Sequence, residues 1–323
     1  MNLLYIVMFG RGVYGVLAVF MVLLFVSSMF SPVTSGFVVK KRTIKVAIIR
    51  QYWDLLDVRI GNKSTIDHKK CLRDAESRYG VKFKVYEFWD GWDGGDVQNG
   101  RLEKLGIDVV IAPGGFGGLC TPKKYRKELK QFVKKGGGFY GICGDSTFGS
   151  LGLKNPPRKS DYFMAKVLGY DKFTPTLGLA NVYTDGSAFD GMVGNLNFLV
   201  KFDAMKFLMQ LAFSRAPIYF PSVDPPIQEH YFGKTVNVML GNAPLVEGHR
   251  LFMPKVAGIA FLNGSDKPYG DGIGGKMVIV ATTYGKGRVV LSAVHPEHTV
   301  GNEEAHDVYE RDVLWLARAL PDT

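Results

Sequence analysis

Two short motifs hold residues that could together attack a carbonyl group. Cys143 lies between small residues in Gly-Ile-Cys-Gly-Asp, residues 141–145, directly after an apolar run. A cysteine in a tight turn between a strand and a helix has a strained backbone, and a helix N-terminus favours the nucleophilic thiolate. The second motif is His295-Pro296-Glu297, in which a histidine could act as a base and a carboxylate could orient it. Each motif alone is weak evidence, since a cysteine that ends a buried strand is commonly a core residue.

A third motif, Pro113-Gly114-Gly115, also follows an apolar run. Its glycines could leave backbone N–H groups free to hold an oxyanion, or they could form an ordinary flexible turn. Ligands of open parallel sheets bind outside the carboxyl ends of the strands. We therefore expect the three motifs to meet at one edge of a sheet.

The elements that would position these motifs alternate along the chain. Apolar runs typical of buried strands are separated by two helical stretches, at about 64–79 and 122–135. The expected strands are 43–49, 81–89, 107–113 and 139–143, with a later hairpin of 276–284 and 288–294 and a final helix to about 320. This order predicts an α/β fold, with an open, mostly parallel sheet and helices on both faces.

The sequence resembles the class I glutamine amidotransferase-like superfamily in three runs, APGGFGG, FVKKGGGFYGICGDSTFG and YGKGRVVLSAVHPEH. Within it, the chain is most similar to the biotin-protein ligase N-terminal-like family, which shares the PGG turn, the GG-x-x-GIC turn and a long insertion. The resemblance covers roughly residues 43–319. It implies a flavodoxin-like domain over 37–323, with an insertion at about 155–250 that we expect at the periphery of the sheet.

The resemblance also implies roles for the motif residues. Cys143 would be the nucleophile, His295 its base and Glu297 the orienting carboxylate, and the N–H groups of Gly115 and Gly144 would form the oxyanion hole. Such a site would cleave a carbon–nitrogen bond through a thioester, without a cofactor.

Some features depart from the family pattern. Asp145 stands where the family usually has glycine, and a carboxylate beside a thiol opposes its ionisation. Cys143 and His295 are farther apart in sequence than in ordinary glutaminases, and we expect neither an ammonia-consuming synthase domain nor a biotin-ligase catalytic domain on this chain. Two hypotheses therefore stay open, an amidohydrolase and a catalytically inactive binding module for a small molecule or peptide.

Other side chains could line the site or compete with it. Tyr52 and Trp53 follow the first strand and could join Pro113, Gly114 and Asp145 in a pocket, or they could be ordinary cap aromatics. His298 could be a substitute base or a solvated surface histidine. The remaining histidines have no ligand spacing, so we expect no metal; they are His68, His230, His249 and His306.

Residues 12–30 form an uncharged apolar run, GVYGVLAVFMVLLFVSSMF, long enough to span a bilayer. We expect residues 1–36 to be an N-terminal hydrophobic helix with a linker, and prefer a retained anchor to a cleaved signal because no clean cleavage site follows. The basic residues after the run favour a cytoplasmic domain by the positive-inside count, whereas Arg11 before it resembles an export signal. We expect the soluble domain outside the cytoplasm.

Composition limits the remaining classes of function. The 323 residues are 46% hydrophobic and carry a net charge of +10, but the basic residues are scattered, so nucleic-acid binding is not expected. The three cysteines, Cys71, Cys120 and Cys143, are irregularly spaced and indicate neither a disulfide framework nor a zinc knuckle.

Overall fold

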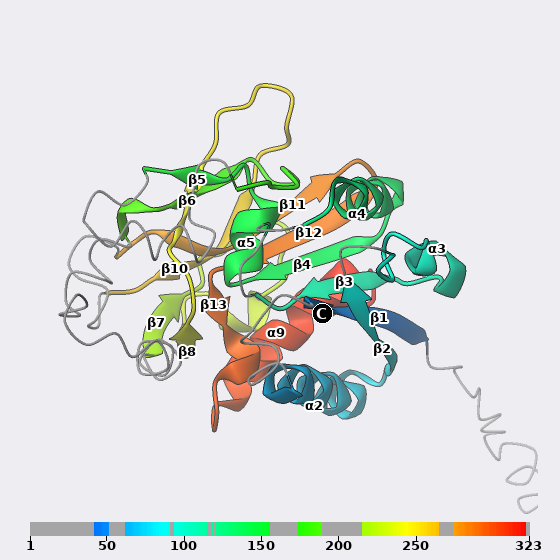
Figure 1. Ribbon diagram of the computed structural model, residues 1–323. Coiled ribbons are helices and arrows are strands. Elements are labelled where there is room, and N and C mark those ends of the chain that lie inside the picture. Colours follow the sequence, from blue (N-terminus) through cyan, green and yellow to red (C-terminus); the bar gives the residue numbers. More distant parts are fainter. Residues whose placement is uncertain are drawn as a thin grey trace, which may run out of the picture. The chain divides into compact units, whose positions relative to one another are not determined.

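The computed structural model describes residues 42–51, 62–90, 94–114, 118, 121–155, 174–188, 215–264 and 274–320. By its internal contacts the chain divides into two units, Met1–Lys41 and Arg42–Thr323, and every described residue belongs to the second. This unit contains a 13-stranded sheet covered by helices (Figure 1). The expected α/β class is confirmed.

One half of the sheet is parallel, and the Pro-Gly-Gly and Gly-Ile-Cys-Gly-Asp motifs lie at the ends of two of its strands. Its strands lie in the order β12-β4-β3-β1-β2, and all neighbours in this half run parallel. The bounds are β1 (Thr43–Gln51), β2 (Lys82–Asp90), β3 (Val109–Ala112), β4 (Gly138–Ile142) and β12 (Gly287–Ser292). Every second residue of β1 faces the same way, so Ile44, Val46 and Ile48 enter one core and Ala47 and Ile49 enter the other.

The two cores lie on opposite faces of the sheet, and each is covered by helices. Helices α2 (Asn62–Tyr79) and α9 (Glu303–Leu316) pack together on the face of Ile44. The opposite face is covered by α3 (Arg101–Leu105), α4 (Lys123–Lys135) and α5 (Gly144–Gly149), which bury Leu102, Leu129 and Phe148. The inner strands β3 and β4 are therefore buried on both sides, as their continuous apolar sequences predict, whereas the edge strand β2 alternates and is mostly part-exposed.

The other half of the sheet is antiparallel, which corrects the expectation of a mostly parallel sheet. Strand β11 (Met277–Tyr284) forms the predicted hairpin with β12. Beyond it follow β10 (Ala257–Leu262), β7 (Arg215–Tyr219), β8 (Thr235–Leu240) and β13 (Val294–His295), each antiparallel to its neighbour. No crossover helix links β7 to β8 within the described residues, so the two strands pair as antiparallel neighbours.

The described part of the insertion is not peripheral, contrary to expectation. Strands β7 and β8 belong to the main sheet, and β6 (Val182–Asp185) and β9 (Leu245–Glu247) connect to it through β11. Two short elements complete this region, β5 (Leu153–Lys154) and the 3-10 helix η2 (Glu229–Tyr231). Alternate residues of β8 are buried, so this strand has an apolar face that needs the core.

The expected membrane segment cannot be compared with these elements, because residues 1–36 lie outside the described part of the chain. Among the helices that are described, none combines the length and the apolar character needed to cross a bilayer.

Candidate functional site

Cys143 occupies a sharp turn between β4 and α5, which we call the elbow (residues 141–145). Its backbone has φ 53° and ψ −124°, a conformation that non-glycine residues rarely adopt. Its N–H donates to the carbonyl of Ser292 at 2.8 Å, which fixes the turn against β12. A Cβ on Gly141 would lie 2.5 Å from the carbonyl oxygen of Asp145, so the turn requires glycine there. Backbone strain of this kind is often kept at functional sites.

The turn after β3 lies against the elbow. Gly114 follows Pro113 with φ 116°, and a Cβ on Gly114 would lie 2.8 Å from the Cβ of Cys143. The Gly114 N–H donates to Oδ2 of the buried Asp145 at 3.0 Å, so this carboxylate joins the two turns. Asp145 therefore accepts a backbone hydrogen bond from the neighbouring turn.

Of the remaining members of the expected pocket, only Gly144 lies within the described residues. Gly144 is the first residue of α5, and its N–H makes no backbone hydrogen bond among the described residues. It is thus available to an acceptor at the elbow. Gly115, Tyr52 and Trp53 lie outside the described residues, so the second oxyanion donor and the aromatic wall stay predictions.

His295 and Glu297 form a buried pair. His295 ends β13, and Glu297 lies in the 3-10 helix η3 (Pro296–His298) that follows. The Nδ1 atom of His295 lies 2.7 Å from Oε1 of Glu297. Burial alone would lower the pKa of His295, but the charges of Glu297 and Cys143 raise it to about 10. Burial would raise the pKa of Glu297, but the charges of His295 and His298 lower it to about 2.

The Cys143 sulfur and the His295 ring both lie next to Gly241 in the folded chain. The position of a Cβ on Gly241 is 2.6 Å from Nε2 of His295 and 3.4 Å from Sγ of Cys143. Cys143 is near enough for its charge to contribute to the raised pKa of the histidine. The sulfur and the imidazole are thus both neighbours of Gly241, and Nδ1 of the imidazole faces the carboxylate.

The Gly241-Asn242 turn was not singled out from the sequence. Its carbonyl at Gly241 accepts from the Cys143 thiol at 3.2 Å. The Asn242 side chain donates to the carbonyl of Cys143 at 2.7 Å and contacts the hydroxyls of Ser146 and Thr147, each at 3.1 Å. A Gly-Asn pair after an alternating strand is a turn signal, but nothing in it indicates the elbow as its partner.

His298 is not the solvated surface histidine that was one of the two expectations. Its side chain is 14% exposed, and its Nδ1 lies 2.9 Å from a carboxylate oxygen of Asp67. Its ring stacks on that of His295, with centroids 5.1 Å apart. His68, on α2, is also near: its Nε2 lies 3.9 Å from Glu297, and burial lowers its pKa to about 4. The spacing along the chain could not indicate this group, because α2 and η3 meet only in the folded protein.

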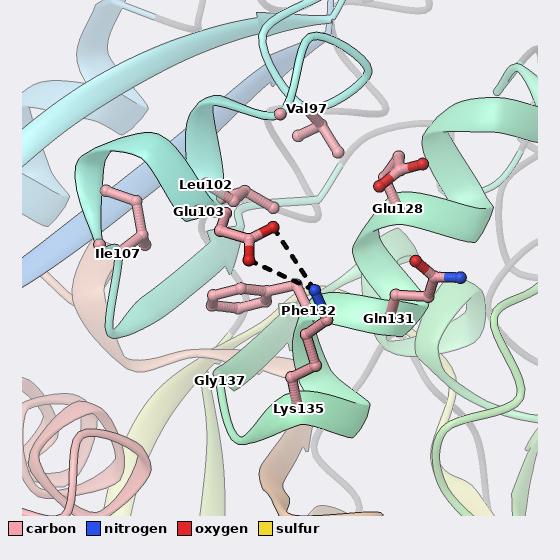
Figure 2. A pocket seen from close by; sticks show the side chains of 11 residues that line it. Val97, Leu102, Glu103, Ile107, Glu128, Gln131, Phe132, Lys135 and Gly137 are labelled. Atoms are coloured by element: carbon pink, nitrogen blue, oxygen red, sulfur yellow. Dashed lines mark hydrogen bonds and ion pairs between the residues drawn. The ribbon is translucent and has the colours of Figure 1, made fainter.

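A separate cavity lies between α3 and α4 (Figure 2). It has a volume of about 290 Å³, and Lys135 pairs with Glu103 at its rim at 3.4 Å. Its lining includes Gly137, which directly precedes β4, and Gly106, which lies shortly before β3. It therefore opens at the amino ends of these strands, whereas Cys143 follows the carboxyl end of β4.

No protein-family model and no curated protein matches this sequence. Among solved structures, the chain is similar to a ThuA-like protein from Parabacteroides merdae, with a TM-score of 0.49, 11% identity and coverage of 88% of this chain and 93% of that one. It is also similar to the glutaminase domain of Trypanosoma brucei CTPS with bound acivicin, with a TM-score of 0.48, 12% identity and coverage of 87% and 96%.

A β-galactosidase from Rahnella gives a TM-score of 0.46 with 14% identity over 86% of this chain, which spans about a third of that enzyme (32%). All three TM-scores are below 0.5, so no function is inferred from these similarities. Fold and site together define an α/β protein with a strained cysteine beside a buried histidine–glutamate pair.

Proposed function

We propose that this chain is a class I glutamine amidotransferase-like protein, closest to the biotin-protein ligase N-terminal-like family, that hydrolyses a carbon–nitrogen bond. The observation that carries the proposal is the geometry at the elbow. Cys143 has a positive φ, its sulfur and Nε2 of His295 both lie next to Gly241, and Nδ1 of that histidine lies 2.7 Å from the buried Glu297. A nucleophile, a base and an orienting carboxylate in this order can perform acyl transfer.

In the proposed reaction, the Cys143 sulfur attacks the carbonyl carbon of an amide while His295 takes the thiol proton. The N–H groups of Gly144 and Gly115 stabilise the resulting oxyanion. Collapse of this intermediate breaks the carbon–nitrogen bond, and the leaving amine takes the proton from His295. Water, deprotonated by His295, then hydrolyses the thioester. Glu297 keeps the imidazole oriented and stabilises its positive charge throughout.

The proposal is tested with thiol-directed amide and ester probes and a panel of small amides and peptides. We expect fast labelling at Cys143, identified by mass spectrometry, and slow labelling at the buried Cys71. Cys143→Ala should abolish hydrolysis with little change in the melting temperature, because the substitution removes one sulfur from a partly buried position. An unfolded variant, together with wild-type protein that lacks activity, would make Cys143 a core residue.

One observation favours the second candidate, a catalytically inactive binding module. The Cys143 thiol donates to the Gly241 carbonyl at 3.2 Å, so its hydrogen is directed at the backbone and not at His295. The two candidates differ in their dependence on the base. His295→Ala should slow Cys143 labelling strongly if the histidine activates the sulfur, and should leave it unchanged in a binding module.

We also propose that residues 12–30 anchor the protein in a membrane and that the domain lies outside the cytoplasm. The support is the uncharged apolar sequence and the Arg11 that precedes it. The substrate or ligand is then a small molecule or peptide reached from that side of the membrane.

A further inference from the structure

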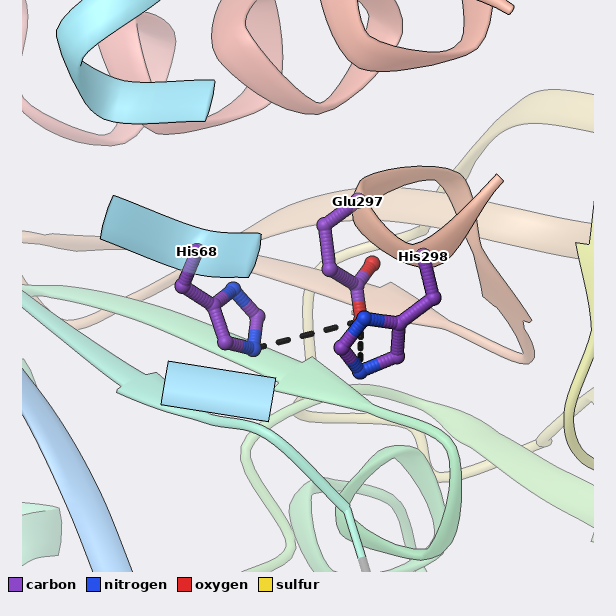
Figure 3. Close-up of side chains that lie close together, drawn as sticks. All are labelled: His68, Glu297 and His298. Carbon is purple, nitrogen blue, oxygen red and sulfur yellow. Dashed lines mark ion pairs between the residues drawn. The ribbon is translucent and has the colours of Figure 1, made fainter. Parts of the chain in front are cut away.

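Behind the His295–Glu297 pair, two more histidines converge on the same carboxylate (Figure 3). His68 comes from α2, and His298 directly follows Glu297 in η3. The two Nε2 atoms lie 3.9 Å and 3.5 Å from Oε1 of Glu297, respectively. One ligand atom from each of the three residues lies within 4.8 Å of the others.

The outer nitrogens of both histidines are held by second residues. Nδ1 of His298 lies 2.9 Å from Oδ2 of Asp67, and Nδ1 of His68 lies 2.9 Å from the hydroxyl of Tyr309. A carboxylate only accepts, so the shared hydrogen lies on Nδ1 of His298. In the neutral ring, Nε2 is then a bare acceptor that faces a carboxylate oxygen. Metal-binding histidines commonly have this support, with the outer nitrogen hydrogen-bonded to a carboxylate or another acceptor.

Two buried polar atoms of these side chains have no hydrogen-bond partner within the described residues. Nε2 of His68 and Oε2 of Glu297 make no hydrogen bond within the described residues, although both side chains are completely buried. Buried polar atoms of native proteins are normally satisfied, and an ion is one of the groups that can satisfy them. When Nδ1 of His68 donates to the Tyr309 hydroxyl, Nε2 of His68 is an acceptor as well, and it then faces Oε1 of Glu297 together with Nε2 of His298.

We propose that His68, His298 and Glu297 bind a divalent transition-metal ion, with Asp67 and Tyr309 orienting the two imidazoles. Two imidazoles and one carboxylate suit Zn²⁺, which takes such sets and leaves a fourth position to water. Ligands of a tetrahedral ion with bonds of about 2.1 Å lie about 3.4 Å apart. The separations of 3.5 and 3.9 Å from Glu297, and the His68–His298 separation of at most 4.8 Å, would have to contract to this value when the ion binds.

Two of these side chains are partly exposed to solvent. His298 is 14% exposed and Asp67 18% exposed, whereas His68 and Glu297 form the buried floor. The ion would therefore enter past His298 and bring the open coordination position toward solvent.

The metal site shares Glu297 with His295, and this gives it a regulatory consequence that rests on the proposed function. A cation at Glu297 competes with His295 for the same carboxylate and repels an imidazolium. Metal binding should then lower the reactivity of Cys143. The site itself does not depend on that activity, so its test uses binding alone.

The test measures Zn²⁺ binding to the full-length chain by equilibrium dialysis, and Co²⁺ binding by the visible absorption of the ion. We expect one metal ion per chain in the wild type. His298→Gln should abolish saturable binding, and Asp67→Asn should weaken it about 10- to 100-fold through loss of the outer hydrogen bond. His68→Gln should also abolish binding; if this buried substitution prevents folding, the part-exposed His298 and Asp67 variants decide.

Two matched controls separate this site from others. His249→Gln changes an exposed histidine and should leave binding intact. Cys143→Ala should also bind normally, although it is inactive under the proposed function. Binding that is absent from the wild type, that persists in His298→Gln, or that is lost in Cys143→Ala overturns the proposal, the last because the ion would then sit on the Cys143–His295 pair.

Discussion

Gly241 lies next to both the sulfur of Cys143 and the imidazole of His295, and a side chain at this position would collide with the imidazole. A methyl group in Gly241→Ala would lie 2.6 Å from Nε2 of His295, a distance that Cβ atoms in real structures essentially never show. The ring must then turn away from the sulfur. A displacement of about 1 Å can cost about 100-fold in rate, so we expect Cys143 labelling and any hydrolysis to fall by about that factor.

The comparison is with Gly274→Ala, where a Cβ would meet backbone atoms only at 3.8–3.9 Å. This control should label at the wild-type rate. Both variants are followed by the rate of Cys143 alkylation and by melting temperature. Equal labelling rates for Gly241→Ala and the control would show that His295 does not activate the sulfur.

At the scale of single residues, the sequence predicts some members of the candidate site and gives no signal for others. Cys143, His295 and Glu297 could be predicted because each follows the end of a strongly apolar strand. Asn242 and His68 could not, because they reach the site from a turn and a helix far along the chain. Their contacts depend on tertiary packing, which no local spacing encodes.

At the scale of elements, the turn between β8 and β9 braces the elbow through Asn242. Asn242→Ala removes a buried donor to the Cys143 carbonyl and to the hydroxyls of Ser146 and Thr147. Leaving buried acceptors unpaired costs about 1–3 kcal/mol, so the urea midpoint should fall correspondingly. Asn263→Ala, which removes an exposed hydrogen bond to Thr235, should change stability by less than about 0.5 kcal/mol. Equal midpoints would show that the turn does not support the elbow.

Helix α9 is joined to the sheet through the buried Asp312, which makes stability depend on pH. Tyr140 donates to this carboxylate at 2.8 Å and Gln228 at 2.9 Å, yet burial raises its pKa from 3.8 to about 7. Between these pH values the folded state binds a proton at Asp312 that the unfolded state does not bind. The free energy of unfolding therefore falls as pH rises through this window, and Asp312 causes no further change above it.

Asp312→Asn removes that dependence. The stability of the variant relative to the wild type should therefore increase as pH rises from about 4 to 7, by a few kcal/mol at most. Urea midpoints of the two proteins across this range measure the effect. Glu310, whose pKa burial raises to about 8, is present in both proteins and cancels in the difference to first order. A difference that does not vary with pH would contradict a buried, protonatable Asp312.

The same elements show why half of the sheet was predictable. Strands β1 to β4 and the β11–β12 hairpin are long apolar runs with clear turns, and their order predicted the parallel half. Strand β7 contains Pro217, which usually argues against a strand inside a sheet, and β9 has only three residues. Such segments become strands by pairing with their neighbours, so their own sequences indicate little.

At the scale of the whole molecule, the apolar run of residues 12–30 differs from the α/β unit in how its apolar side chains can be kept from water. The unit has buried apolar cores of its own, whereas the run has no charged residues to turn toward water, which supports the proposed membrane anchor. We expect the full chain to stay in the membrane fraction during carbonate extraction, and a chain that begins at residue 37 to be released. Intact mass distinguishes retention from cleavage: a mature N-terminus near Ser35 would show a removed signal, and release of the intact, uncleaved chain would contradict the anchor.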